Sequence, residues 1–175
     1  MGRTWLGFHR LLGTLLLCTA LAAPSASAAP DPERAQVMVR DVTERMLEVL
    51  RSEPPADAAS EAAWLADRMR AIVAPTLDFV TMTKLAVGSH WLDAGDDQKR
   101  ALVKQFRELL LGTYAKSLQE YDNQEIEFLP LRNGGRADRV KVRSKVIRSD
   151  GPEIAVHDRL RHHDGEWTVY GITVD

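Results

Sequence analysis

Apolar residues recur every three or four positions through the first half of the chain, which is the spacing of amphipathic helices. The first stripe follows Asp31, a good N-cap, and Pro32, which suits the first helical position. Gly88 is placed to end the third stripe as a C-terminal cap. The four stripes predict helices over about 32–51, 61–73, 77–87 and 97–121.

After residue 122 the apolar period changes to two, which is the spacing of half-buried strands. The alternation predicts four strands, over about 125–128, 139–146, 154–161 and 167–174. Helices followed by consecutive strands predict an α+β fold, with the N-terminal helices packed on one face of a curved antiparallel β-meander. In the last strand apolar residues stand at both odd and even positions, so we expect that strand to be covered on both sides.

The turns between the strands also predict their register. An Asp-Gly pair at 164–165 is a strong two-residue hairpin signal, and a tight turn there places Leu160 opposite Val169. Matching the inward faces of the preceding hairpin places Val146 opposite Ile154, with Gly151 at positive φ in a three-residue loop.

The first 28 residues have the layout of a secretory signal peptide. Arg3 and Arg10 precede an apolar run over 11–23, and the small residues Ala-Ser-Ala at 26–28 precede the expected cleavage site. An N-terminal membrane anchor is the alternative interpretation. Cleavage leaves one domain over 29–175 and changes the net charge from −2 to −4, because two arginines and no acidic residue are removed.

The sequence contains little that suggests catalysis. A net negative charge argues against a nucleic-acid-binding protein, and no glycine-rich phosphate loop follows a strand. The adjacent His162 and His163 lack the spacing of a metal site, so we expect neither a metal nor a cofactor. Asp78 and His90 flank the third helix and could form an acid–base pair, but Asp78 is better explained as an N-cap.

Two features leave alternatives open. The apolar faces of helices and sheet could enclose a ligand cavity or an ordinary filled core. The outward positions of two neighbouring strands are basic and could form a docking surface for a partner or a solvated face, partly neutralised by Glu125 and Glu127. The basic residues are Arg139, Lys141, Arg143, Lys145, Arg159 and Arg161.

A family resemblance bears on both alternatives. Residues 78–91, with Phe79, Met82, Leu85, Gly88 and Trp91 at their spacing, resemble the MlaC family. These are periplasmic phospholipid-binding components of an ABC lipid-transport system, also described as toluene-tolerance proteins. Further similar segments lie at 106–110, 113–115, 129–131, 140–143 and 165–170.

The resemblance implies a monomeric phospholipid shuttle and not an enzyme. Its implied partners are an outer-membrane lipoprotein–porin complex and an inner-membrane ABC transporter complex, between which lipids move to maintain outer-membrane lipid asymmetry. It also implies a cone-like domain with an apolar cavity. We expect the cavity to be lined by Phe79, Met82, Leu85, Trp91, Phe106, Leu110, Tyr114, Val142, Val156 and Val169.

Two departures from the family pattern have consequences. The chain stops at Asp175, where the family continues with a further segment, so a wall or lid of the cavity is expected to be missing. Asp158 stands on the inward face where the family pattern has a tyrosine, with Ser144, Tyr170 or a helix arginine as expected partners. A cavity isomerase or dehydratase that uses Asp158 beside Tyr114 or Tyr170 is one alternative function, and a periplasmic interaction module with a filled core is another.

Overall fold

The computed structural model describes residues 29–132, 136–148 and 151–175. The expected signal peptide lies outside these residues. Helices α1 (Pro32–Leu50), α2 (Glu61–Ile72) and α3 (Phe79–Val87) lead to the short α4 (His90–Asp93) and the long α5 (Asp96–Leu118). A 3-10 turn, η1 (Ala74–Thr76), joins α2 to α3. Within the described residues, no helix is long and apolar enough to cross a membrane.

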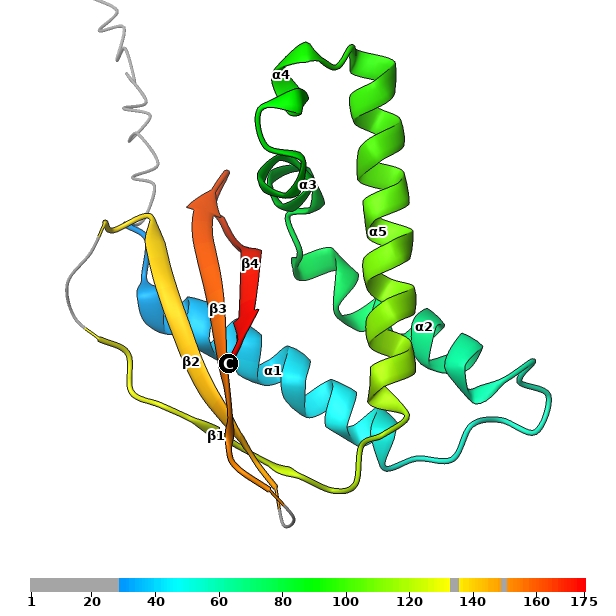
Figure 1. Cartoon of the computed structure of the whole chain (residues 1–175). Coiled ribbons are helices and arrows are strands. Elements are labelled where there is room, and N and C mark those ends of the chain that lie inside the picture. The colour runs from blue at the N-terminus through cyan, green and yellow to red at the C-terminus, as the bar shows by residue number, and fades with distance from the viewer. Residues whose placement is uncertain (1–28, 133–135, 149–150) are drawn as a thin grey trace, which may run out of the picture.

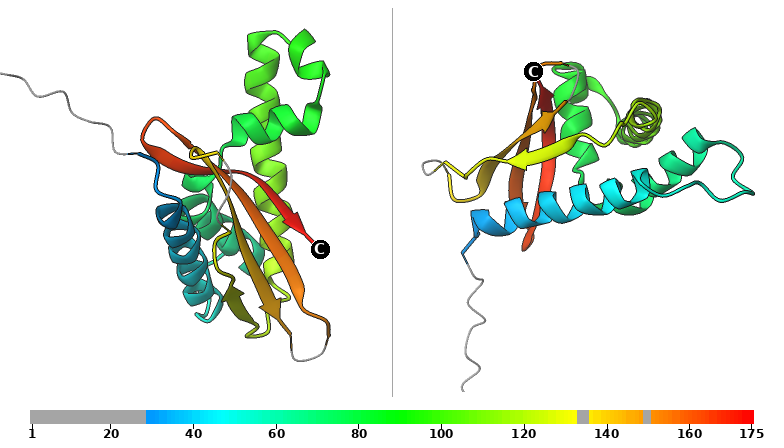
Figure 2. Two further views of the ribbon diagram at one scale, coloured as in Figure 1. Left: turned by 90° about the vertical axis from the view of Figure 1, so that its left-hand side faces the viewer. Right: turned by 90° about the horizontal axis from the view of Figure 1, so that it is seen from below.

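The second half of the chain forms one antiparallel sheet with the strand order β1-β2-β3-β4, as Figure 1 shows. The strands are β1 (Glu125–Phe128), β2 (Arg139–Ile147), β3 (Ile154–His163) and β4 (Glu166–Val174). The helices pack against one face of this sheet, and α1 runs across it beneath β2 and β4 (Figure 2). The predicted α+β class and the meander order are therefore confirmed. The two short elements η1 and α4 were not predicted, because three or four residues are too few to show a helical period.

Side-chain N-caps are present at three helices, and those of Asp31 and Asp78 were predicted. Asp31 accepts a hydrogen bond from the backbone N–H of Glu33 at 3.0 Å, and Ser60 accepts one from Ala63 at 3.1 Å. Asp78 accepts one from Thr81 at 3.0 Å, so its N-cap role at α3 is confirmed. These bonds satisfy N–H groups that have no partner inside the helix. Gly88 ends α3 with a φ of 65°, a conformation that glycine adopts without steric cost.

The register predictions are confirmed for both hairpins, since Leu160 pairs with Val169 and Val146 pairs with Ile154. The expectation for Gly151 was wrong, because its φ lies outside the left-handed region. A side chain there would instead meet the Arg148 guanidinium, whose Cζ would be 3.3 Å from the added Cβ.

A β-bulge in β4 changes which residues face the helices. Arg159 pairs with Gly171 and the next residue, Leu160, pairs with Val169, so Tyr170 is an extra residue in the ladder. Val169 and Ile172 consequently both face the helices, although they stand three residues apart. The expectation that β4 is covered on both sides was wrong. It rested on apolar residues at both odd and even positions, but the bulge shifts the alternation, so Ile172 faces the same side as Val169.

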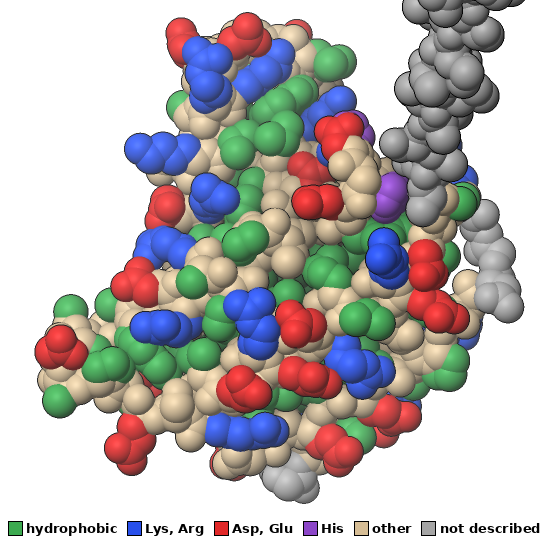
Figure 3. All heavy atoms as spheres, turned by 180° about the vertical axis from the view of Figure 1, so that it is seen from behind, with side chains coloured by type: hydrophobic (Ala, Val, Ile, Leu, Met, Phe, Trp, Pro, Cys, Tyr) green, Lys and Arg blue, Asp and Glu red, His purple; other side chains and the backbone are tan. Residues whose placement is uncertain are grey.

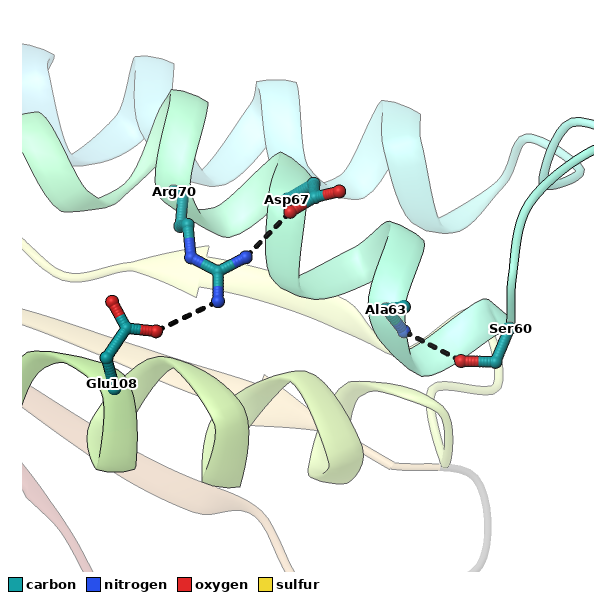
Figure 4. A network of polar contacts seen from close by, with 5 residues as sticks. All are labelled: Ser60, Ala63, Asp67, Arg70 and Glu108. Carbon is teal, nitrogen blue, oxygen red and sulfur yellow. Dashed lines mark hydrogen bonds and ion pairs between the residues drawn. The ribbon is translucent and has the colours of Figure 1, made fainter.

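Helix α5 is held against α2 by packing and by an ion pair. Leu65 of α2 and Leu111 of α5 are almost completely buried. At the surface, Arg70 of α2 contacts Glu108 of α5 at 3.0 Å and Asp67 of its own helix at 2.6 Å (Figure 4). Such exposed ion pairs contribute little free energy, so α5 is held against α2 mainly by its buried residues.

Candidate functional site: an apolar cavity beneath the sheet

A cavity of about 640 Å³ lies between the inner face of the sheet and the helices α1 and α5. This volume falls within the ~300–1,000 Å³ typical of ligand sites. One wall is the apolar stripe of α1, which contributes Met38, Val42 and Met46 at helical spacing. The sheet forms the opposite wall with inward-facing residues of all four strands, among them Ile126, Val146, Ile154 and Ile172.

Four of the ten residues expected to line the cavity do so. Leu110 and Tyr114 face it from the C-terminal half of α5, and Val156 and Val169 face it from β3 and β4. The lining residues of α1 were missed by the sequence analysis. Their helical stripe was recognised, but a stripe that faces a cavity has the same period as one that faces a filled core.

The other six residues do not line the cavity. Phe79 and Met82 are buried elsewhere in the core, and Val142 is completely buried where α1 packs against β2. Trp91 and Phe106 are half-buried. Leu85 is 58% exposed, so its expected orientation toward the interior was wrong.

The physical reason is the place of α3 and α4 in the fold. These helices pack on the N-terminal half of α5 and project beyond the end of the sheet (Figures 1 and 2). The segment that carries the family motif therefore stabilises this projection and not the cavity wall. Apolar side chains are exposed on the projection among charged ones, as Figure 3 shows, and the exposed large apolar residues of α3 and α4 are Val80, Leu85 and Leu92.

One end of the cavity lining, its rim, comes from the α5–β1 connection and from the neighbouring ends of β2 and β3. The exposed side chains of Glu120 and Asp122 line this rim from the α5–β1 connection. Arg148 lines it from the end of β2. A charged rim around an apolar interior suits a ligand with a polar end and apolar chains.

Two polar residues lie inside the cavity, away from this rim. Ser144 of β2 is 6% exposed and Asp158 of β3 is 8% exposed, and both belong to the lining. No described residue forms a hydrogen bond or ion pair with the Asp158 carboxyl, so the expected partners were wrong. Burial alone raises the pKa of Asp158 from its ordinary value of 3.8 to about 6, since a charged carboxylate is poorly solvated there.

Tyr170, the expected partner of Asp158, instead lies on the outer face of the sheet, next to the inward-facing Val169. The guanidinium carbons of Arg139 and Arg159 stand 5.9 and 5.7 Å from the centre of its ring. Gly171 makes room for Arg159, because an added Cβ would come within 2.7 Å of its Nη2. Tyr170 thus supports the basic face rather than the cavity.

The six basic residues of the outer face are not equivalent. Lys145 pairs with Glu153 at 2.6 Å, and Arg143 donates to the backbone carbonyl of Pro130 at 2.8 Å. Arg161 forms a 2.6 Å ion pair with Asp78, the N-cap of α3.

The remaining three, Arg139, Lys141 and Arg159, form no ion pair with any residue that the structure describes. Lys141 and Arg159 are direct cross-strand partners. Glu127 of β1 stands opposite Lys145, on the far side of β2 from this trio. The uncompensated charge is therefore concentrated where β2 and β3 run together.

Across the described ranges, histidine, cysteine and acidic residues form no cluster of three or more that could hold a metal ion. His162 packs edge-on against Trp167, with 5.2 Å between the ring centres. His163 lies 2.8 Å from Asp164 in the exposed hairpin turn.

Comparisons with known proteins agree with this geometry. The profile described as MlaC protein matches residues 40–175. Over 87 residues the chain is 29% identical to the intermembrane phospholipid transport system binding protein MlaC of Haemophilus influenzae, an alignment that covers 48% of this chain and 41% of that protein. The chain therefore aligns with less than half of this relative's length.

The fold is similar to a solved structure of the phospholipid-binding protein from Ralstonia solanacearum, in complex with a phospholipid. The TM-score is 0.70 at 26% sequence identity, and the match covers 81% of this chain and 78% of that one.

Proposed function

Because the chain belongs to the MlaC family, we propose that it binds phospholipid in the cavity beneath the sheet and carries it across the periplasm. The observation that carries this proposal is the cavity of about 640 Å³, with its apolar walls and charged rim. A relative of the same fold is described in complex with a phospholipid. Acyl chains gain ~0.8 kcal/mol for each buried CH₂, so an apolar interior of this kind supplies the affinity that a carrier needs.

In this proposal the acyl chains lie between α1, α5 and the sheet, and the headgroup stays at the rim near Arg148. Release then depends on docking to a membrane complex, because the affinity of the interior for hydrocarbon is high. An outer-membrane lipoprotein–porin complex and an inner-membrane ABC transporter complex are the proposed donor and acceptor, and maintenance of outer-membrane lipid asymmetry is the proposed outcome.

The function is tested on protein recovered from the periplasm after expression of the full chain. Intact-mass measurement is expected to find a mature chain that begins near Ala29, and organic extraction is expected to yield phospholipid in near-stoichiometric amount. A lipid-free protein that also takes up no phospholipid from vesicles would contradict the carrier function. In that case the cavity-enzyme alternative at Asp158 becomes the better hypothesis.

We further propose that Arg139, Lys141 and Arg159 steer the carrier toward an acidic protein surface of its membrane complexes. These three cations are free of ion pairs within the described chain, while the mature chain as a whole has a net charge of −4. A local field of this kind acts mainly on the association rate, and salt screens it over ~10 Å at 0.1 M.

Reversal of the three residues to Glu is expected to slow association with one membrane complex by about tenfold at low salt and to leave the bound lipid in place. Arg143 and Arg161 are left unchanged, because they hold Pro130 and Asp78. The matched control is reversal of Lys84, Lys104 and Lys116, exposed helix lysines with the same total charge change. Association rates are measured at low and high salt, with anionic vesicles as a separate arm. Equal rates for both triple variants would show that only net charge matters.

A further inference from the structure

Asp158 is a buried carboxyl that the carrier function leaves unexplained. It lies in the middle of β3 with only 8% of its surface exposed, and it faces the cavity. Val142 and Ile172 stand beside it on the neighbouring strands, and both are apolar. Asp78, the other well-buried aspartate, differs sharply, because it caps α3 and pairs with Arg161.

No charge of the cavity wall compensates Asp158. Helix α1, α2 and η1 contribute only uncharged side chains to the lining, and α5 contributes the phenol of Tyr114. The charged lining residues Glu120, Asp122 and Arg148 lie at the rim. Ile154 marks that rim on β3, and Asp158 is four residues further along the strand, or about 13 Å at strand spacing. Burial is the only cause of its altered pKa, so none of these groups acts on it appreciably.

Hydrocarbon in the cavity makes the environment of this carboxyl still less polar. Without a ligand, water that enters from the open rim can solvate the carboxylate. A lipid chain displaces that water and supplies no hydrogen-bond donor, and an isolated charge in hydrocarbon is far more costly than a neutral acid. The carboxyl avoids this cost by binding a proton from solvent, which forms an O–H bond and leaves a neutral acid.

We propose that Asp158 forms a proton-linked subsite for apolar chains, in which loading of the cavity with lipid is accompanied by uptake of one proton at Asp158. This inference rests on the proposed function, because it assumes that hydrocarbon is the natural occupant. It deepens that function by making cargo affinity depend on pH at one residue.

The direction of the dependence follows from the two pKa values of the carboxyl. In the empty cavity the pKa of Asp158 is about 6, and in the loaded cavity it is higher. Below about pH 6 both forms are protonated and the affinity is constant. Above that pH the empty form ionises first, so the affinity falls by up to tenfold per pH unit until the pKa of the loaded form is reached.

The test measures binding of the uncharged fluorescent probe 1-N-phenylnaphthylamine to delipidated full-length mature protein between pH 5.5 and 8.5. Wild type is expected to bind at least tenfold more weakly at pH 8 than at pH 6. Asp158→Asn, which keeps the shape and cannot ionise, is expected to show a flat profile. The control Glu125→Gln removes an exposed carboxyl of β1 that does not line the cavity, and it is expected to follow wild type. Parallel profiles for wild type and Asp158→Asn would overturn the inference.

A second measurement needs no variant. Loading the wild type with the probe at pH 7 in weakly buffered indicator solution is expected to take up close to one proton per protein, and no uptake would equally overturn the inference. The two proposals fail differently. If phospholipid binds but its affinity does not depend on Asp158, only the proton linkage is contradicted. If the probe shows the linkage but the protein takes up no phospholipid, only the carrier function is contradicted.

Discussion

Replacement of both Leu110 and Val156 with Trp is expected to remove most of the bound phospholipid and to leave the fold intact. The two residues face the cavity from opposite walls, on α5 and β3, so the indoles fill it from both sides. If they exclude about four methylene groups of the lipid, the affinity falls by about 3 kcal/mol, or roughly a hundredfold. The phospholipid-to-protein ratio after extraction measures the effect.

The matched control is Leu109→Trp. Leu109 precedes Leu110 on the same helix but is 69% exposed and does not line the cavity, so its variant is expected to keep its lipid. Val142→Trp is expected to behave differently again. Val142 is completely buried in the core, so the larger side chain there destabilises the fold by about 1–3 kcal/mol without entering the cavity. Full lipid content in the variant with both Leu110 and Val156 replaced by Trp would show that the lipid binds outside this cavity.

The second large effect concerns the stability of the lipid-free protein. The folded pKa of Asp158 is about 6 and its ordinary value is 3.8, so between these values the folded state binds more protons than the unfolded state. The free energy of unfolding therefore falls as pH rises from about 4 to about 6, and the whole contribution is about 3 kcal/mol. Asp158→Asn lacks this contribution.

The difference in unfolding free energy between Asp158→Asn and wild type is expected to rise by about 3 kcal/mol from pH 3 to pH 7, in favour of the variant. Urea unfolding of delipidated protein at several pH values measures this difference, and all other titrating groups cancel in the comparison. Glu120→Gln, at the exposed rim, is expected to give a nearly constant difference over the same range. A constant difference for Asp158→Asn as well would show that water solvates this carboxyl fully in the empty cavity.

The sequence alone placed Leu110 and Val156 correctly, but it did not give the surroundings of Asp158. Leu110 and Val156 could be placed in the interior by period alone, because each belongs to a regular stripe that must face something apolar. Asp158 was recognised as a carboxyl on an inward face, but its expected hydrogen-bond partners were wrong. Side-chain partners depend on distances between elements, and periodicity carries no information about those distances.

The sequence by itself determined the helices, the strands, their order in the meander and the register of both hairpins. These depend on local signals: apolar period, capping residues such as Asp78, and the turn at 164–165. The same signals indicated that β2 and β3 carry a basic outer face.

Only the tertiary structure decided which apolar residues line a cavity and which fill a core. The motif segment at 78–91 is strongly apolar, but α3 and α4 lie beside the N-terminal half of α5. The cavity wall is therefore formed by α1 instead. The bulge at Tyr170 brings Ile172 to the same inner face as Val169, a change that no alternation pattern reveals. Both outcomes depend on how elements distant in sequence fit together, which is settled by packing over the whole fold rather than by local preference.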